Sequence, residues 1–201
     1  MASEPMKQGQ EGLDWKQNVL LYIQDLIHLS AVVILVFLLL FRVIIVSGDS
    51  MYNTLVDGDY LLLVSNLFYK DPQYGDIIVA SKDSFDNGSP IIKRVIATEN
   101  QTVDIDFDQG IVYVDGQPLQ EDYTYTPTNV REGMQFPLTV EKGCIFVMGD
   151  NRNRSKDSRN PEIGLVDKRE VLGKAIFLFL PAVDTDAGRN TPDYDRIGVI
   201  K

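Results

Sequence analysis

The sequence has few of the residues that build metal centres, disulfide frameworks or histidine-dependent active sites. Its 201 residues include one cysteine, Cys144, and one histidine, His28. A single cysteine cannot form a disulfide within the chain, and the scarcity of both residue types excludes a Cys/His zinc cluster. His28 lies at the edge of an apolar run near the N-terminus, so a nucleophile in the body of the chain is expected to use a different base.

Basic residues are also in the minority. There are 19 Lys and Arg against 29 Asp and Glu, which gives a net charge of −10 at pH 7. Nucleic-acid binding depends on a basic surface, so no nucleic-acid partner is expected. The remaining composition, 44% hydrophobic and 24% charged, is that of a globular protein whose core is large enough to fold without disulfides or metals.

One long run of the sequence lacks formal charge. Residues 26–41 hold no Asp, Glu, Lys or Arg, and the apolar pattern resumes after Arg42 and continues to residue 46. About 21 residues of this kind can cross a bilayer, and the long Arg42 side chain can reach the interface. The sequence therefore predicts a transmembrane anchor at residues 26–46, preceded by a polar segment at 1–25. A buried core helix and a cleaved signal peptide fit the same run and remain alternatives.

Beyond the anchor, short runs of β-branched and aromatic residues alternate with Gly, Pro, Asn and Asp. This alternation is typical of strands joined by turns. Asp115-Gly116 predicts a tight hairpin because glycine tolerates positive φ. The predicted strands cover residues 43–47, 60–64, 76–80, 91–97, 102–107, 111–114, 144–148 and 171–180. The fold class predicted is mainly β, with one N-terminal transmembrane helix followed by a domain of antiparallel sheets.

Two segments carry side chains suited to serine-dependent hydrolysis. Ser50 lies in the turn-forming segment 47–55, where a serine at a strand end has free backbone amides nearby, as a nucleophile with an oxyanion hole requires. Lys93 and Arg94 point to opposite faces of a strand, so one of them must face inward or line a cleft. A lysine in apolar surroundings has a lowered pKa and can accept the proton of a serine. The alternatives are a plain turn for the first segment and an edge-strand lysine for the second.

A third segment, residues 149–159, is a polar loop rich in Asp, Asn, Arg and Ser. Asp157 and Arg159 are close enough in sequence to pair across a turn. A solvated charged loop would have the same composition, so this segment alone decides nothing.

Taken together, the three segments resemble the motifs of the type I signal peptidases, which are membrane-bound serine-lysine proteases. The family's motif S-G-x-S-M-x-P-T-L is matched by residues 47–55, with Asn53 in the place of the proline. Its K-R-V strand is matched by residues 93–95, and its loop G-D-N-R-x-x-S-x-D-S-R by residues 149–159. The three blocks follow one another in the order found in the family.

The resemblance implies a role for each matching residue. Ser50 would be the nucleophile, Lys93 its general base, and Met51 a wall of the adjoining substrate pocket. Ser155 would orient the lysine by a hydrogen bond, and Asp157 with Arg159 would hold the loop against the catalytic strands. Some members of the family use a hydroxyl two residues before the nucleophile as a second oxyanion donor. That position is Gly48 here, so a backbone group or a water is expected to serve instead.

The resemblance also implies the activity and its setting. The chain would be a membrane-bound endopeptidase that removes signal peptides from secreted preproteins, cutting after A-x-A-like sites through an acyl-enzyme and needing no metal or organic cofactor. It would cross the cell membrane once, in contact with membrane lipid, and residues 47–201 would form an extracytoplasmic catalytic domain. Within that domain, residues 98–143 would be a non-catalytic insertion and 182–201 a polar tail. This topology rests on the resemblance, because residues 1–25 carry more acidic than basic groups and give no orientation.

The substrate backbone is expected to pair with an exposed strand edge, and the candidates are residues 47–51 and the strand at 76–80. Two other functions remain open. Self-cleaving repressors of the SOS type use a serine-lysine pair on a β-rich fold, but they have no apolar N-terminal segment. A signal-peptidase-like factor could also act without proteolysis in the assembly of surface structures such as pili.

Overall fold

The computed structural model describes residues 15–200, in two units that divide between Leu38 and Leu39. The described part of the first unit belongs to helix α1 (Trp15–Leu40), of which the last two residues lie beyond the division. The helix is long and apolar enough to cross a membrane, and none of its residues is buried. It is therefore not the core helix that the sequence left as an alternative.

The boundaries of α1 differ from those of the predicted anchor. The helix already begins at Trp15, and it ends at Leu40, where strand β1 (Phe41–Ile45) follows directly. Every residue of β1 pairs with β2 (Tyr60–Ser65), from Phe41 opposite Val64 to Ile45 opposite Tyr60. Since the β-branched residues 43–45 gain a partner strand, they belong to the sheet and not to the helix.

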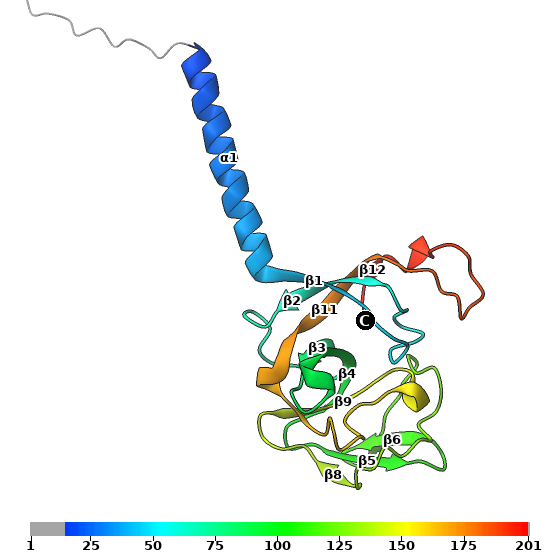
Figure 1. Ribbon diagram of the computed structural model, residues 1–201. Coiled ribbons are helices and arrows are strands. Elements are labelled where there is room, and N and C mark those ends of the chain that lie inside the picture. Colours follow the sequence, from blue (N-terminus) through cyan, green and yellow to red (C-terminus); the bar gives the residue numbers. More distant parts are fainter. Residues whose placement is uncertain (1–14, 201) are drawn as a thin grey trace, which may run out of the picture. The chain divides into compact units, whose positions relative to one another are not determined.

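The second unit contains two antiparallel sheets (Figure 1). The larger has eight strands, of which seven follow the spatial order β1, β2, β11 (Val171–Leu180), β3 (Ile77–Ser81), β4 (Pro90–Thr98), β9 (Cys144–Met148) and β10 (Val166–Asp167). The eighth, β12 (Gly198–Val199), pairs with β11 off this path. The smaller sheet has the order β7 (Gln117–Pro118), β6 (Ile111–Val114), β5 (Thr102–Asp106) and β8 (Leu138–Thr139). Four short 3-10 helices occur in the connections, η1 (Asp86–Gly88), η2 (Arg152–Arg154), η3 (Lys168–Glu170) and η4 (Tyr194–Arg196).

The antiparallel β fold predicted from the sequence is confirmed, and each predicted strand has a counterpart. Asp115 and Gly116 both have positive φ and join β6 to β7 as a two-residue hairpin, with Val114 opposite Gln117. The strands that the sequence did not predict, β7, β8, β10 and β12, have two residues each. Such short pairings carry too few side chains to produce an alternating pattern.

The centre of the larger sheet is buried on both faces. Along β3, Ile77 and Val79 belong to one apolar cluster, whereas Ile78 and Ala80 belong to another. Strand β4 lies beside it and is likewise buried from Ile91 to Ala97. The two polar residues of β4 are buried as well, with 4% of Lys93 and 2% of Arg94 exposed. The sequence predicted that at least one of these two side chains faces inward. Both are buried, because both faces of the sheet are covered at this point.

Candidate active site

Ser50 lies in a tight loop between β1 and β2, which we call the Ser50 turn (residues 46–59). Two hydrogen bonds close the base of the loop, from Val46 N to the Asp59 carbonyl at 2.8 Å and from Gly58 N to the Val46 carbonyl at 2.9 Å. Met51 and Leu55, one helical turn apart, are each 1% exposed and pack into the core of the larger sheet. These two apolar anchors fix the turn and leave the neighbouring Ser50 partly exposed.

Strand β4 brings Lys93 to this turn. The Lys93 Nζ atom donates hydrogen bonds to Ser50 Oγ at 2.8 Å and to the Ile92 carbonyl at 2.9 Å. The serine and the lysine are 43 positions apart in the sequence, and the structure brings their side chains into direct contact.

Burial sets the protonation of this lysine. Desolvation disfavours the charged ammonium and lowers the pKa of Lys93 from 10.5 to about 8, and the nearby Arg159 charge acts in the same direction. The carboxylates of Asp157 and Asp150 oppose the shift without cancelling it. A large share of the lysine is therefore neutral in mildly alkaline solution and can accept a proton.

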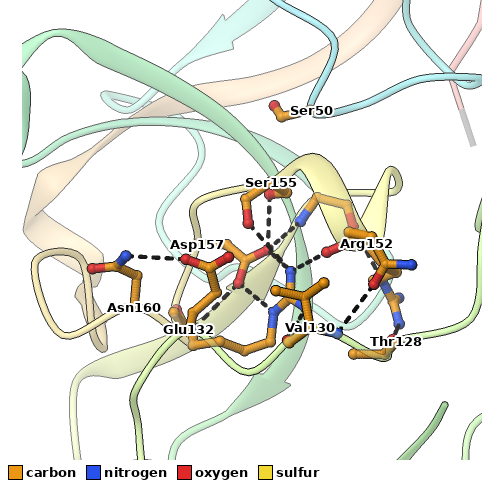
Figure 2. A network of polar contacts seen from close by, with 12 residues as sticks. Ser50, Thr128, Val130, Glu132, Arg152, Ser155, Asp157 and Asn160 are labelled. Carbon is orange, nitrogen blue, oxygen red and sulfur yellow. Dashed lines mark hydrogen bonds and ion pairs between the residues drawn. The ribbon is translucent and has the colours of Figure 1, made fainter. Parts of the chain in front are cut away.

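The loop after β9 is organised around the buried carboxylate of Asp157 (Figure 2). Its Oδ2 atom accepts hydrogen bonds from the Gly149 amide at 3.0 Å, the Ser155 hydroxyl at 2.8 Å and Arg159 Nη2 at 2.8 Å. Arg159 Nε also donates to Oδ1 at 2.8 Å, which makes the ion pair bidentate, and neither side chain is exposed. Burial alone would raise the pKa of Asp157, but the hydrogen bonds and charge of Arg159 hold it below its usual value.

A second buried ion pair joins the three segments. Arg94 donates from Nε to Asp150 Oδ1 at 2.9 Å and from Nη2 to Oδ2 at 2.7 Å. The Thr54 hydroxyl of the Ser50 turn donates to the same Asp150 Oδ2 at 2.6 Å. The loop also holds the turn through its backbone, because Asn151 N donates to the Ser50 carbonyl at 3.0 Å. The sequence analysis missed this pair, although the Arg beside Lys93 in an apolar strand was a usable signal.

The sequence comparisons agree with this geometry. Residues 19–180 match the family described as signal peptidase, peptidase S26. The chain belongs to the signal peptidase family. It is 41% identical over 144 residues to a probable signal peptidase I-1 of Synechocystis, covering 68% of this chain and 70% of that protein. Signal peptidase I of Bacillus licheniformis is 32% identical over 174 residues, which cover 83% of this chain and 91% of that relative.

A crystal structure of a signal peptidase I from Enterococcus faecalis is 34% identical to the chain, with a TM-score of 0.42. The match covers 52% of this chain and 97% of that one. The resemblance predicted from the three motifs is confirmed by the family match. Helix α1 together with membership of the signal peptidase family indicates a membrane-anchored protein.

Ser155 does not make the contact that the resemblance to signal peptidases implied. Within residues 15–200, the hydrogen bonds of Lys93 Nζ go to Ser50 and Ile92, and the Ser155 hydroxyl donates its hydrogen bond to Asp157 Oδ2. The serine nevertheless lies beside the Ser50 turn. A Cβ atom added to Gly149 would come within 2.3 Å of both Ser155 Oγ and the Ser50 carbonyl oxygen. Ser155 and the Ser50 carbonyl therefore both lie close to Gly149, and Ser155 makes no hydrogen bond to the lysine.

Gly48 shapes the turn with a backbone conformation that favours glycine. Its φ is +86°, and its amide donates to Asp57 Oδ1 at 2.7 Å. The Gly48 amide is thus already engaged and is not available as an oxyanion donor. By contrast, the Ser50 amide makes no hydrogen bond to any residue in the described part of the chain.

A cavity of about 370 Å³ opens in front of the Ser50 and Lys93 side chains. Its walls include residues 44–46 at the end of β1, the buried Met51, and residues 89–92 at the start of β4. Strand β9 pairs with β4 from Arg94 onward, so within residues 15–200 the edge of residues 90–93 that faces away from β3 has no partner strand. The predicted substrate edge at residues 76–80 is wrong, because β3 pairs with both β4 and β11.

Replacing Arg159 with methionine is expected to destabilise the fold strongly. The substitution leaves Asp157 as a buried charge without its cation, which costs about 3–5 kcal/mol. Urea denaturation followed by circular dichroism would measure the loss in the free energy of unfolding. Arg169→Met is the matched control, since Arg169 also pairs with an aspartate two positions away but its side chain is 89% exposed. The control should be unchanged within error, and equal stability of both variants would contradict the structural role of the Asp157 pair.

Proposed function

We propose that this chain is a membrane-anchored endopeptidase that removes N-terminal signal peptides from secreted preproteins, with Ser50 as nucleophile and Lys93 as general base. The single observation that carries the proposal is the 2.8 Å contact between Lys93 Nζ and Ser50 Oγ in a site where the lysine is almost fully buried. Membership of the signal peptidase family supports the substrate class.

The reaction is an acyl transfer in two halves. Neutral Lys93 takes the Ser50 proton as Ser50 Oγ attacks the scissile carbonyl carbon. The Ser50 amide donates to the resulting oxyanion, and a water supplies the second hydrogen bond because Gly48 N is engaged. The protonated lysine then passes its proton to the leaving amine as the peptide bond breaks. Lys93, neutral again, takes a proton from the water that attacks the ester, and returns it to Ser50 as the acid leaves.

The cavity supports recognition of apolar side chains near the cut. Its wall beside Ser50 includes Ile44, Met51 and Ile92, against which the alanine side chains of the preprotein would pack. The preprotein would lie extended along residues 90–93, on the edge of β4 that faces away from β3 and has no partner strand among the described residues. These contacts fit an A-x-A-like site.

The proposed topology has one membrane crossing. Helix α1 would span the bilayer in contact with lipid, and the β-rich unit from Phe41 onward would lie on the extracytoplasmic side. Within that unit, residues 98–143 carry the smaller sheet and none of the proposed dyad. Glu121 of this insertion forms an ion pair with Arg152 of the loop after β9, so the insertion would help to hold that loop in place.

The cleavage rate should rise with pH through the titration of Lys93. Only the neutral amine accepts a proton, so kcat/KM should increase about tenfold per unit below pH 8 and level off above it. Initial rates on a peptide with an Ala-X-Ala site, measured in buffers of constant ionic strength, would give the profile. A rate that is flat between about pH 6 and 9 would count against the lysine base.

The test of the function itself is cleavage of a preprotein by the detergent-solubilised full chain, with mass spectrometry locating the cut. The expected product is a mature protein that begins directly after the A-x-A-like site. Complete absence of cleavage, in a sample shown to be folded, would instead favour the non-proteolytic assembly factor.

A further inference from the structure

The tail segment (residues 182–200) lies beyond residues 19–180, the part of the chain that matches the family. It was predicted to be a polar tail, yet it folds back onto the larger sheet. In β12, Val199 pairs with Phe177 of β11, and Ile200 N donates to the Ile176 carbonyl at 3.1 Å. Ile200 packs against the same apolar cluster that holds Met51 and Leu55 of the Ser50 turn.

Arg196, at the end of η4, connects the tail segment to the Ser50 turn. Its Nη2 atom donates to Asp59 Oδ2 at 2.6 Å and its Nη1 atom to Oδ1 at 3.1 Å, which forms a bidentate ion pair. The Nη2 atom also lies 3.3 Å from the Thr54 carbonyl oxygen. Asp59 is fully buried and the Arg196 side chain is 19% exposed, so water weakens this pair little.

The Asp59 carboxylate accepts hydrogen bonds from several segments of the chain. It accepts hydrogen bonds from Val56 N at 2.8 Å and from Ala182 N, where the tail segment begins, also at 2.8 Å. Its own carbonyl receives the Val46 amide that closes the base of the turn. The conformation of residues 46–59 thus depends on a buried charge whose counter-ion comes from the tail segment.

Thr54 is held from two sides. Its carbonyl oxygen faces Arg196, and its hydroxyl donates to Asp150, the carboxylate that pairs with Arg94 next to the base. A continuous series of hydrogen bonds therefore runs from the tail segment through the turn to strand β4. Loss of the Arg196 contacts would remove one of the two supports of Thr54 in the turn.

We infer that Arg196 of the tail segment is a positioning residue for the proposed reaction and holds the Ser50 turn so that Ser50 Oγ stays within reach of Lys93 Nζ. The inference rests on the proposed function, and it assigns a role to residues that the family match does not cover. Arg196 touches neither Ser50 nor Lys93 and so acts through Asp59 and Thr54.

Arg196→Gln in the full-length chain tests this inference, with kcat and KM measured on the same peptide substrate. Because a misplacement of about 1 Å can cost 10²-fold, kcat should fall about 10- to 100-fold. KM should change less than kcat, since the cavity walls at β1 and β4 do not involve Arg196, although Met51 of the Ser50 turn also lines the cavity. Arg196→Lys keeps the charge facing Asp59 and should recover part of the rate.

The pH profile of the Arg196→Gln variant separates positioning from simple destabilisation. The charged groups that act on Lys93 are Asp157, Asp150, Arg159 and Asp49, and the substitution leaves all of them in place. A loosened Ser50 turn admits water to the lysine, so the rising limb of kcat/KM should move to higher pH. A smaller folded fraction would lower the rates equally at every pH.

The control is Arg189→Gln, since Arg189 belongs to the same tail segment but pairs there with Asp193. This variant should cleave at the wild-type rate. If the wild type itself fails to cleave, the proposed function has failed. If the wild type cleaves and the Arg196→Gln variant has the same kcat, the positioning role is overturned. It is also overturned if the variant loses rate only in proportion to its loss of folded protein and its pH profile is unshifted.

Discussion

Replacing Lys93 with methionine is expected to lower kcat/KM for preprotein cleavage by about 10²- to 10⁴-fold, the range contributed by general acid-base catalysis. The variant keeps a side chain of similar length but has no lone pair to accept the proton of Ser50. Ser50→Ala should lose activity at least as completely, because it removes the attacking oxygen. Single-turnover cleavage of a labelled preprotein would measure both variants.

The Lys93 variant should remain folded, which makes the loss of activity interpretable. The pKa of Lys93 is about 8 in the folded chain and 10.5 when unperturbed, so the unfolded chain binds more protons between those values. Stability therefore rises with pH through this window, and near pH 7 the buried lysine costs stability in full. Methionine removes that cost, and the unfolding midpoint at pH 7 should be equal or higher. Near-normal turnover by the folded variant would exclude the dyad.

Gly149→Ala is expected to cause the second large loss, about 10²-fold in kcat/KM. The added methyl group would lie 2.3 Å from the Ser50 carbonyl oxygen and from Ser155 Oγ, far inside van der Waals contact. The backbone oxygen cannot rotate away as a flexible side chain would, so the Ser50 turn and the loop after β9 must move relative to each other, which displaces Ser50 from its present place beside Lys93.

Gly198→Ala is the matched control for this substitution. Gly198 has an ordinary φ, and its Cβ would meet no atom within 4 Å. The control should cleave at the wild-type rate. Similar activities of the two variants would show that the turn tolerates the displacement, and that the close approach at Gly149 does not fix Ser50.

The strands could be predicted because their side chains alternate or form continuous apolar runs, a local signal along the chain. The burial of Lys93 and Arg94 together could not, since it depends on which strands flank β4 and on what covers both faces of the sheet. The end of α1 was misplaced for a similar reason. Apart from Arg42, residues 41–45 are as apolar as a membrane helix, and it is their pairing with β2 that makes them a strand.

The candidate site was predictable where a short motif carries it, and less so where distant residues meet. Ser50, Lys93 and the pairing of Asp157 with Arg159 follow from three compact segments. The hydrogen bond from Ser155 to Asp157 could not be read from the motif, because a hydroxyl near both a lysine and a carboxylate has a choice of partners. Arg196 and Asp59, separated by 137 positions, show no sign of their pairing in the sequence.

The most direct test of the central claim is the protonation of Lys93 itself. Lysine labelled with ¹³C at Cε, assigned through the Lys93→Met variant, would give the titration of this amine by NMR in the full-length protein. The account predicts a midpoint near pH 8, set by burial beside Ser50. A midpoint at the ordinary value of 10.5 would mean that the lysine is charged and solvated, and it would contradict the proposed mechanism.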